Sequence, residues 1–389
     1  MRSRRLIKIV SPLLLGSMAL AACGGDDDGS SSGDGDKKTY KIAYQGPLSG
    51  DNAQLGINMR NAVELAVEEA NKKGDLPFDL EFVVSDDQGT PDGGPPAAQK
   101  LIDDEAVIAV VGPAFSGATK ASEPLFSQAN LVSVSPSATN PDLTSLGFTS
   151  FARVVPPDDA QGQEAARFMA KGLKAKKVYS VDDKSEYGTG LSKVIETELK
   201  TQGVPFVHEG IAPTKDYSAI GSKIAGSGSD VLYYSGYFAD FGLFAKAVRA
   251  AGFKGKMVSG DGSNDDQFIV GAGSDAEGVL FTCPCADARI DPKAAGFAAA
   301  YKAKFNVDPG TYSPESYDAA NAIISVLGST GDEPTREAVT KAVLAVDYTG
   351  ITKQIKFDAK GEVQGKTIFV YEVKGGKRVI NGTTEELSK

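Results

Sequence analysis

Residues 106–119 of this 389-residue chain have the sequence AVIAVVGPAFSGAT. The six apolar residues at its start are typical of a strand that is buried on both faces of a parallel sheet. A Gly-Pro pair ends this run, and Ser116 with Gly117 provides the start of a helix that we expect to continue to about Ala129. A buried strand followed directly by a helix is the repeating unit of a doubly wound α/β fold.

The same unit recurs along most of the chain. Short β-branched runs alternate with segments whose apolar residues are spaced i, i+3, i+4 and i+7, as in an amphipathic helix. We expect strands at 40–44, 80–84, 106–111, 131–135, 178–181, 206–211, 231–234, 257–259, 279–282, 353–357 and 366–373. We expect helices between the caps Asn52 and Gly74 and at 96–104, 117–129, 160–173, 188–201, 217–225, 238–251, 292–305, 315–327 and 336–345. The last two strands flank residues 358–361, whose composition is that of a hairpin turn.

The alternation is interrupted once, by the pair Pro156-Pro157. About 350 residues follow the N-terminal segment, and this exceeds the size at which one hydrophobic core keeps growing, so we expect two domains. A single barrel would need about eight uninterrupted units, and the interruption therefore favours two separate sheets. Open sheets of this kind bind ligands beyond the carboxyl ends of their strands. With two such sheets face to face, the expected ligand site is the cleft between them.

The N-terminal segment indicates export. Basic residues precede a short apolar stretch, which predicts a secretory signal at 1–22. The stretch ends in Leu-Ala-Ala-Cys, which resembles a bacterial lipobox in which the thiol of Cys23 receives a diacylglycerol. Two acyl chains suffice for stable anchoring, although an incidental cysteine after an ordinary signal is the alternative. Residues 23–38 are rich in Gly, Ser and Asp, and we expect a flexible tether that holds an extracytoplasmic domain at the outer face of the cell membrane.

Composition argues against several classes of function. The net charge of −10 disfavours nucleic-acid binding, because phosphate contacts require Lys and Arg. His208 is the only histidine and no G-x-S-x-G string follows an expected strand, which disfavours a Ser-His-Asp hydrolase or a zinc enzyme. Residues 361–367 resemble a P-loop, but they are one residue short and lie between expected strands. We expect no catalytic residue, no bound metal and no cofactor.

Three cysteines are present in the chain. With Cys23 taken by lipid, Cys283 and Cys285 remain, separated by one proline. Exported proteins can keep disulfides, and two cysteines this close can just reach disulfide distance. The sequence leaves a disulfide and two free thiols equally open.

Six short strings occur in a distinctive order after residue 40. They are Gly46-Pro47-Leu48-Ser49-Gly50, Val111-Gly112-Pro113 with Ser116, Pro136-Ser137-Ala138-Thr139, Tyr187-Gly188 with Gly190, Tyr233-Tyr234-Ser235-Gly236-Tyr237 and Gly260-Asp261-Gly262. In this order they resemble the leucine/isoleucine/valine-binding proteins of ABC transporters, which have the type I periplasmic-binding fold. Each string alone is weak evidence, but six in family order are specific. The resemblance extends from about Lys41 to Lys389.

The resemblance implies an α/β protein with two doubly wound parallel-sheet lobes joined by a three-strand hinge. It implies a lobe 1 of residues 39–155 and 285–367 and a lobe 2 of residues 156–284 and 368–389. The crossings would fall near Pro156, near Cys283-Pro284-Cys285 and near Ile368. Composition alone does not predict this interleaving. The Cys-Pro-Cys segment would then be a rigid hinge connector without a redox function.

The family's ligand positions can be matched to this chain one residue at a time. Ser116 and Thr139 would offer hydroxyls, and the backbone at Ser137 and Ala138 further hydrogen bonds, to an amino-acid carboxylate near the positive end of a helix. Asp261, between two glycines, would accept from the ligand ammonium. The plainer interpretations are that Ser116 is an ordinary helix cap and Asp261 an ordinary turn residue.

Five further positions match family residues around the ligand. Tyr187 and Tyr237 match aromatic residues that close over the ligand, while Leu55, Phe115 and Tyr312 match positions around its side chain. Core or rim packing is the alternative for each. The mixture favours a ligand with an aliphatic or otherwise apolar side chain.

The resemblance also implies the partners. We expect a monomer that binds a small amino acid and docks on the permease subunits of an ABC importer. Two alternatives stay open: the import of urea, a short amide or another small polar solute, and an extracellular sensor that passes ligand state to a partner receptor.

Overall fold

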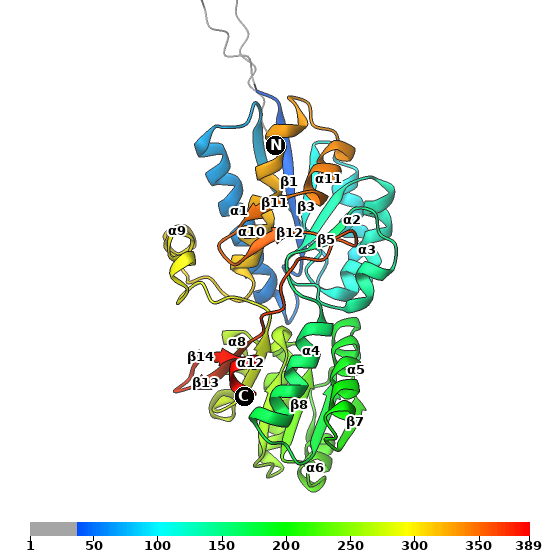
Figure 1. Cartoon of the computed structure of the whole chain (residues 1–389), viewed down its shortest axis with the longest axis vertical. Helices are drawn as coiled ribbons and strands as arrows, with labels where there is room; N and C mark the ends of the chain where they lie inside the picture. The colour runs from blue at the N-terminus through cyan, green and yellow to red at the C-terminus, as the bar shows by residue number, and fades with distance from the viewer. Residues whose placement is uncertain (1–36) are drawn as a thin grey trace, which may run out of the picture. The chain divides into compact units, whose positions relative to one another are not determined.

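The computed structural model describes residues 37–389 (Figure 1). The expected signal peptide at 1–22, the lipidated Cys23 and the tether up to Asp36 lie outside the described residues. From residue 37 onward, no helix combines the length and the apolarity that crossing a membrane requires.

The first sheet has five parallel strands in the order β2-β1-β3-β4-β5. We call this sheet, with the helices packed on it, lobe 1. Its strands are β1 (Thr39–Gly46), β2 (Asp79–Asp86), β3 (Val107–Val111), β4 (Val132–Ser135) and β5 (Phe151–Arg153). Its helices are α1 (Ala53–Lys73), α2 (Gly94–Ile102), α3 (Ser116–Gln128), α10 (Ser313–Leu327) and α11 (Arg336–Leu344), with α9 (Ala295–Phe305) against α1.

The second sheet has seven strands in the order β14-β13-β10-β9-β8-β6-β7, and with its helices we call it lobe 2. Its parallel strands are β6 (Val178–Asp182), β7 (Phe206–Gly210), β8 (Val231–Ser235), β9 (Lys256–Ser259) and β10 (Leu280–Cys283). Two antiparallel strands, β13 (Phe369–Lys374) and β14 (Lys377–Thr383), extend it beyond β10. Its helices are α4 (Asp158–Arg167), α5 (Glu186–Thr201), α6 (Ser218–Gly226), α7 (Phe238–Ala250), α8 (Asp266–Ala272) and α12 (Thr384–Leu387).

The periodicity of the sequence explains the principal elements. The expected apolar stripe of α1, including Met59, Val63 and Ala66, is fully buried in lobe 1. The helix ends at Gly74, whose φ of 69° lies in the left-handed region that favours glycine. All five residues of β3 are buried, as its unbroken apolar run predicts. The elements β5, α8, β14 and α12 were not predicted.

The predicted turn at residues 358–361 is confirmed, with an antiparallel bridge between Phe357 and Val363, but the predicted strands on either side of it do not pair with each other. The turn itself forms, with the N–H of Asp358 donating to the carbonyl of Glu362. However, β12 (Gln354–Lys356) pairs with β11 (Asp347–Thr349), and β13 pairs in the other sheet. The chain after the turn instead lies beside β5, where Arg153 bridges to Glu362. A buried salt bridge between these two side chains holds it there.

Membership of the two sheets changes along the chain. It changes after Arg153, where the chain enters lobe 2, and again between Cys283 at the end of β10 and α10, which packs on β3. Residues from Phe369 onward join lobe 2 once more (Figure 1, red). The predicted lobe boundaries remain a prediction, and these changes of sheet support it.

Candidate functional site

Ser116 opens α3 directly beyond the end of β3. Its side chain is buried, and its hydroxyl oxygen accepts from the backbone N–H of Asn140 at 3.2 Å. The N-cap residue of α3 is Phe115, and no side chain caps this helix end. Ser116 is therefore not an ordinary N-cap residue, and it joins the start of α3 to the loop that follows β4.

That loop contains the other predicted donors. The Ser137 hydroxyl donates to the carbonyl of Ala114 at 2.7 Å, and the Ala138 N–H donates to the Ser135 hydroxyl at 3.0 Å. The buried Thr139 hydroxyl has no hydrogen-bond partner within residues 37–389. The four residues Ser116, Ser137, Ala138 and Thr139 lie together at the carboxyl ends of two neighbouring strands, and we call them the donor cluster.

Arg153 fixes the donor cluster from β5. Its fully buried guanidinium donates through Nη1 to the carbonyl oxygens of Ala138 at 3.0 Å and Asn140 at 2.8 Å. Its Nε donates to Glu362 Oε2 at 2.8 Å. The loop therefore has a rigid support made entirely by residues of lobe 1.

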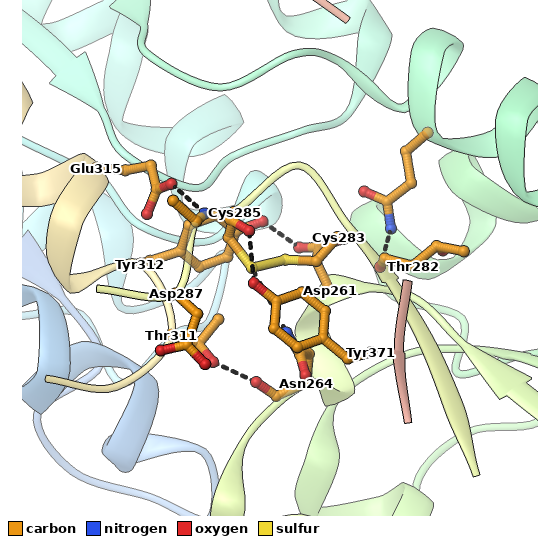
Figure 2. The surroundings of a disulfide bond; sticks show 12 residues. Asp261, Asn264, Thr282, Cys283, Cys285, Asp287, Thr311, Tyr312, Glu315 and Tyr371 are labelled. Atoms are coloured by element: carbon orange, nitrogen blue, oxygen red, sulfur yellow. Dashed lines mark hydrogen bonds between the residues drawn. A yellow bond between two sulfur atoms is a disulfide. The ribbon is translucent and has the colours of Figure 1, made fainter. Parts of the chain in front are cut away.

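Asp261 lies in lobe 2, just beyond the end of β9. Its side chain is buried, and it accepts from Tyr187 at 2.8 Å through Oδ1 and from Tyr312 at 2.6 Å through Oδ2. Figure 2 labels Asp261 and Tyr312 in the same neighbourhood. Burial raises the pKa of Asp261, whereas the hydrogen bonds from Tyr312 and Tyr187 lower it. Two phenols thus favour the charged carboxylate in a site whose burial opposes charge.

The predicted aromatic residues also meet. The Phe115 ring of lobe 1 stacks on the Tyr237 ring of lobe 2 with centroids 4.3 Å apart, and Tyr187 lies 5.3 Å from Tyr237. Leu55, Phe115 and Tyr312 are buried members of one apolar cluster. Tyr312 was expected beside the ligand's side chain, but its hydroxyl bonds to the acid instead. It has a φ of 65°, a backbone conformation that a bulky side chain seldom adopts.

The sequence analysis missed Asp158, the first residue of α4. This side chain is fully buried, and neither of its carboxyl oxygens has a hydrogen-bond partner in the described part of the chain. Its backbone N–H donates to the Thr139 carbonyl at 2.8 Å. Burial, followed by the charge of Asp261, raises the pKa of Asp158 well above its ordinary range, whereas the nearby Thr139 hydroxyl, which lies outside hydrogen-bond geometry, lowers it. The signal for it was an acid directly after Pro156-Pro157, which looked like an ordinary helix start.

Cys283 and Cys285 form a disulfide in the structure (Figure 2). Both residues are buried. The Cys285 carbonyl accepts from the Tyr371 hydroxyl at 2.8 Å, and the neighbouring Ala286 N–H donates to Glu315 at 2.7 Å. The segment after β10 is therefore tied to β13 in lobe 2 and to α10 in lobe 1.

Within residues 37–389, the single histidine and its acidic neighbours do not form a metal site. His208 lies between Asp182 at 2.6 Å and Glu196 at 3.1 Å, on the β7 edge of lobe 2. Residues 37–389 contain no group of three or more His, Cys, Asp or Glu side chains that could hold a metal ion.

Comparisons with known proteins agree on one family. The family model described as "Periplasmic binding protein" matches residues 39–378. The "Leucine-, isoleucine-, valine-, threonine-, and alanine-binding protein" of Pseudomonas aeruginosa is 32% identical over 338 residues, which cover 86% of this chain and 90% of that protein. The "Leu/Ile/Val-binding protein" of Citrobacter freundii is 29% identical, with 86% and 91% covered.

Solved structures agree with the sequence comparisons. A leucine-binding protein, LivK, from Thermotoga maritima superposes with a TM-score of 0.81 at 26% identity, over 88% of this chain and 98% of that one. LivJ from Streptococcus pneumoniae, in complex with isoleucine, gives a TM-score of 0.81 at 27% identity, over 89% and 99%.

Proposed function

We propose, from the fact that this chain belongs to the periplasmic binding protein family, that it binds an amino acid for an ABC importer. The observation that carries the proposal is Asp261, a buried acid that takes a phenol hydrogen bond on each carboxyl oxygen. A buried carboxylate must be compensated or else take up a proton, because an unpaired buried charge is costly. An ammonium group would supply that compensation.

The two ends of an amino acid fit the two sides of the site. Its ammonium would contact Asp261, and the buried, unpartnered Asp158 lies close enough to Asp261 for that charge to raise its pKa. Its carboxylate would accept from the Thr139 hydroxyl, which has no partner within the described residues, and from the Ser116 hydroxyl. The start of α3 adds the positive end of a helix dipole.

The surroundings favour an apolar ligand side chain. Phe115 and Tyr237 stack across the site, and Leu55 and Tyr312 are buried in the same apolar cluster as Phe115. The relatives whose printed names include leucine, isoleucine and valine support a branched-chain or similar amino acid for this chain as well.

The remaining expectations belong to the same proposal. The protein would be a monomeric lipoprotein, anchored through Cys23 at the outer face of the cell membrane and held off it by residues 23–38. Ligand would close the two predicted lobes on each other, because it makes extra contacts in the closed state. Lobe 1 would consist of residues 39–155 with 285–367, and lobe 2 of residues 156–284 with 368–389. The closed form would dock on the permease subunits.

Calorimetry tests the proposal. The chain from residue 24 onward would be titrated with leucine, isoleucine, valine, alanine, threonine, phenylalanine, glutamate and lysine, and also with urea and acetamide. We expect saturable binding of at least one amino acid with an apolar side chain and none of its N-acetylated derivative. Binding of urea or acetamide alone would support the amide alternative, and no binding of any amino acid would overturn the proposal.

A further inference from the structure

Arg378 does not hydrogen-bond to Asp261 within the described residues, but it bonds to Asn264, three residues after that acid. It projects from β14, and its side chain is only 3% exposed. Its Nη1 donates to the Asn264 side-chain oxygen at 3.0 Å, to the Asn264 carbonyl and to the Thr311 hydroxyl at 2.8 Å. Its Nε donates to Asp266 at 2.6 Å. One planar guanidinium therefore joins the last strand of lobe 2 to two other segments.

The first of these segments carries the acid. We call residues 260–265 the acid loop. The Asn264 N–H donates to the Asp261 carbonyl at 2.9 Å and closes the short turn on which Asp261 lies. The Asn264 amide also donates to the sulfur of Cys285 at 3.5 Å. Any shift of Asn264 therefore moves the backbone of Asp261.

The second segment carries a phenol that bonds to the acid. Thr311 directly precedes Tyr312, and its hydroxyl also donates to the Asn264 carbonyl (Figure 2). Arg378 thus holds the acid loop and, through Thr311, the residue that donates to Asp261.

The acid loop and the segment around Thr311 are closely packed between the lobes. The Asn58 amide of α1 donates to Asp265 at 3.1 Å, and the Ser313 hydroxyl donates to the Asn58 carbonyl at 3.0 Å. A Cβ on Gly310 would lie 2.3 Å from the Asn58 amide nitrogen, so a side chain at this position would have to displace the Asn58 amide.

We propose that Arg378 is a positioning residue that sets the place of the Asp261 carboxylate for the ligand. This inference rests on the proposed function. Its physical basis is the planar fork of arginine, which donates to several acceptors at once, whereas lysine offers a single compact charge. Mutation of a residue that supports a ligand-binding group can change affinity by about 10- to 100-fold, even though that residue does not touch the ligand.

A double-mutant cycle tests the inference. Arg378→Met, Asp261→Asn and the double variant would be titrated with the best amino acid from the panel. We expect Arg378→Met to weaken binding by about tenfold in the wild-type background and by less than about twofold in the Asp261→Asn background. Equal losses in the two backgrounds would overturn the inference, because the effect would then not pass through the acid.

Two further variants separate positioning from general stability. Arg289→Met is the matched control, because within residues 37–389 Arg289 also donates to Asp266, at 3.3 Å, but does not bond to Asn264 or Thr311. It should leave affinity unchanged within about twofold. Arg378→Lys keeps the charge and should not restore affinity, so full rescue by lysine would contradict the inference. If Arg378→Met fails to fold, Thr311→Val should still weaken binding severalfold, and unchanged affinity in that variant would count against the inference.

A readout without ligand separates this inference from the proposed function. Carbon-13 NMR of the Asp261 carboxyl group follows its titration directly. Loss of the support at Arg378 should weaken the Tyr312 hydrogen bond and move the Asp261 titration to higher pH, whereas Arg289→Met should leave it in place. If no amino acid binds, the proposed function fails, but this shift still decides the role of Arg378.

Discussion

The donor cluster of lobe 1 and the acid loop of lobe 2 are supported in different ways. The donor cluster is supported mainly from lobe 1, where Arg153 on the neighbouring strand holds the carbonyl oxygens of Ala138 and of the adjacent Asn140, and it takes one bond from lobe 2, from the Asp158 N–H to the Thr139 carbonyl. The acid loop depends on Tyr187, on Tyr312 from lobe 1 and on Arg378 from β14, more than a hundred residues later. The acid loop thus takes its partners from three segments that are distant in sequence, whereas the main support of the donor cluster is one side chain of the adjacent strand.

The chemistry explains this difference. Hydroxyl and amide groups are satisfied by one or two ordinary hydrogen bonds, and burying them then costs little. A buried carboxylate must be hydrogen-bonded and compensated, or it takes up a proton. The acid loop should therefore be the more sensitive half of the site, and each experiment below tests that expectation.

Removal of the acid should have the largest effect. Losing one partner of a buried charge pair costs about 2–5 kcal/mol, so Asp261→Ala should weaken amino-acid binding at least about thirtyfold. Calorimetry would measure the change, with Asp332→Ala on the exposed surface of lobe 1 as the control. A loss below about threefold would place the ammonium elsewhere.

The pH dependence of binding should report the same acid. Burial raises the pKa of Asp261 above its ordinary value of 3.8, so its charge is present above the raised pKa and lost as pH falls through it. Affinity should then drop by about tenfold per pH unit below that pKa. Asp261→Asn should flatten this limb of the profile. An unchanged acid limb in that variant would assign it to another group.

Each phenol on the acid should have an intermediate effect. Tyr312→Phe removes only the hydroxyl that donates to Asp261, and a hydrogen bond to a charged group contributes about 1.5–3 kcal/mol. We expect about a tenfold loss of affinity and an acid limb that moves to higher pH, because this bond lowers the pKa of Asp261. Tyr217→Phe is the matched control, since Tyr217 donates to Asp240, outside the acid loop. An equal effect of both variants would contradict a specific role.

The donor cluster should respond least to a single change. Thr139→Val removes a neutral hydroxyl that has no partner in the described residues, and the loss of about 1 kcal/mol for such a bond corresponds to about fivefold weaker binding. Thr340→Val is the control, since Thr340 is a half-buried residue of α11 whose hydroxyl donates to the Asn130 carbonyl, outside the donor cluster. If Thr139→Val weakened binding more than Asp261→Ala, the donor cluster would be the more sensitive half of the site, contrary to our expectation.

The sequence predicted the donor cluster better than the surroundings of the acid. Residues 106–119 place Ser116 at a strand end by periodicity alone, because strand, turn and helix follow one another directly. Asp261 was found through the resemblance to a family. The contact of Tyr312 with Asp261 and the burial of Asp158 were not predictable, since both arise from tertiary packing of segments that are distant in sequence.

The prediction of the C-terminal strands failed for a related reason. Lys377 and Arg378 at the start of β14 and the Asn-Gly pair at its end resemble a loop. Strand β14 nevertheless forms, because it pairs with β13 and its Arg378 side chain enters the interior. Local pattern also suggested that the strand before residues 358–361 would pair with the strand after them, although these strands belong to different sheets.

The late position of β14 has a consequence for biogenesis. Arg378 follows Asn264 by 114 residues. Because synthesis begins at the N-terminus, all of β1 to β10 are made before Arg378 can bond to the acid loop. During that interval the donor cluster can form, since Arg153 is already present, but the acid loop lacks its guanidinium support. A secretion intermediate halted before residue 378 would therefore have a nearly complete fold but a poorly positioned Asp261 carboxylate.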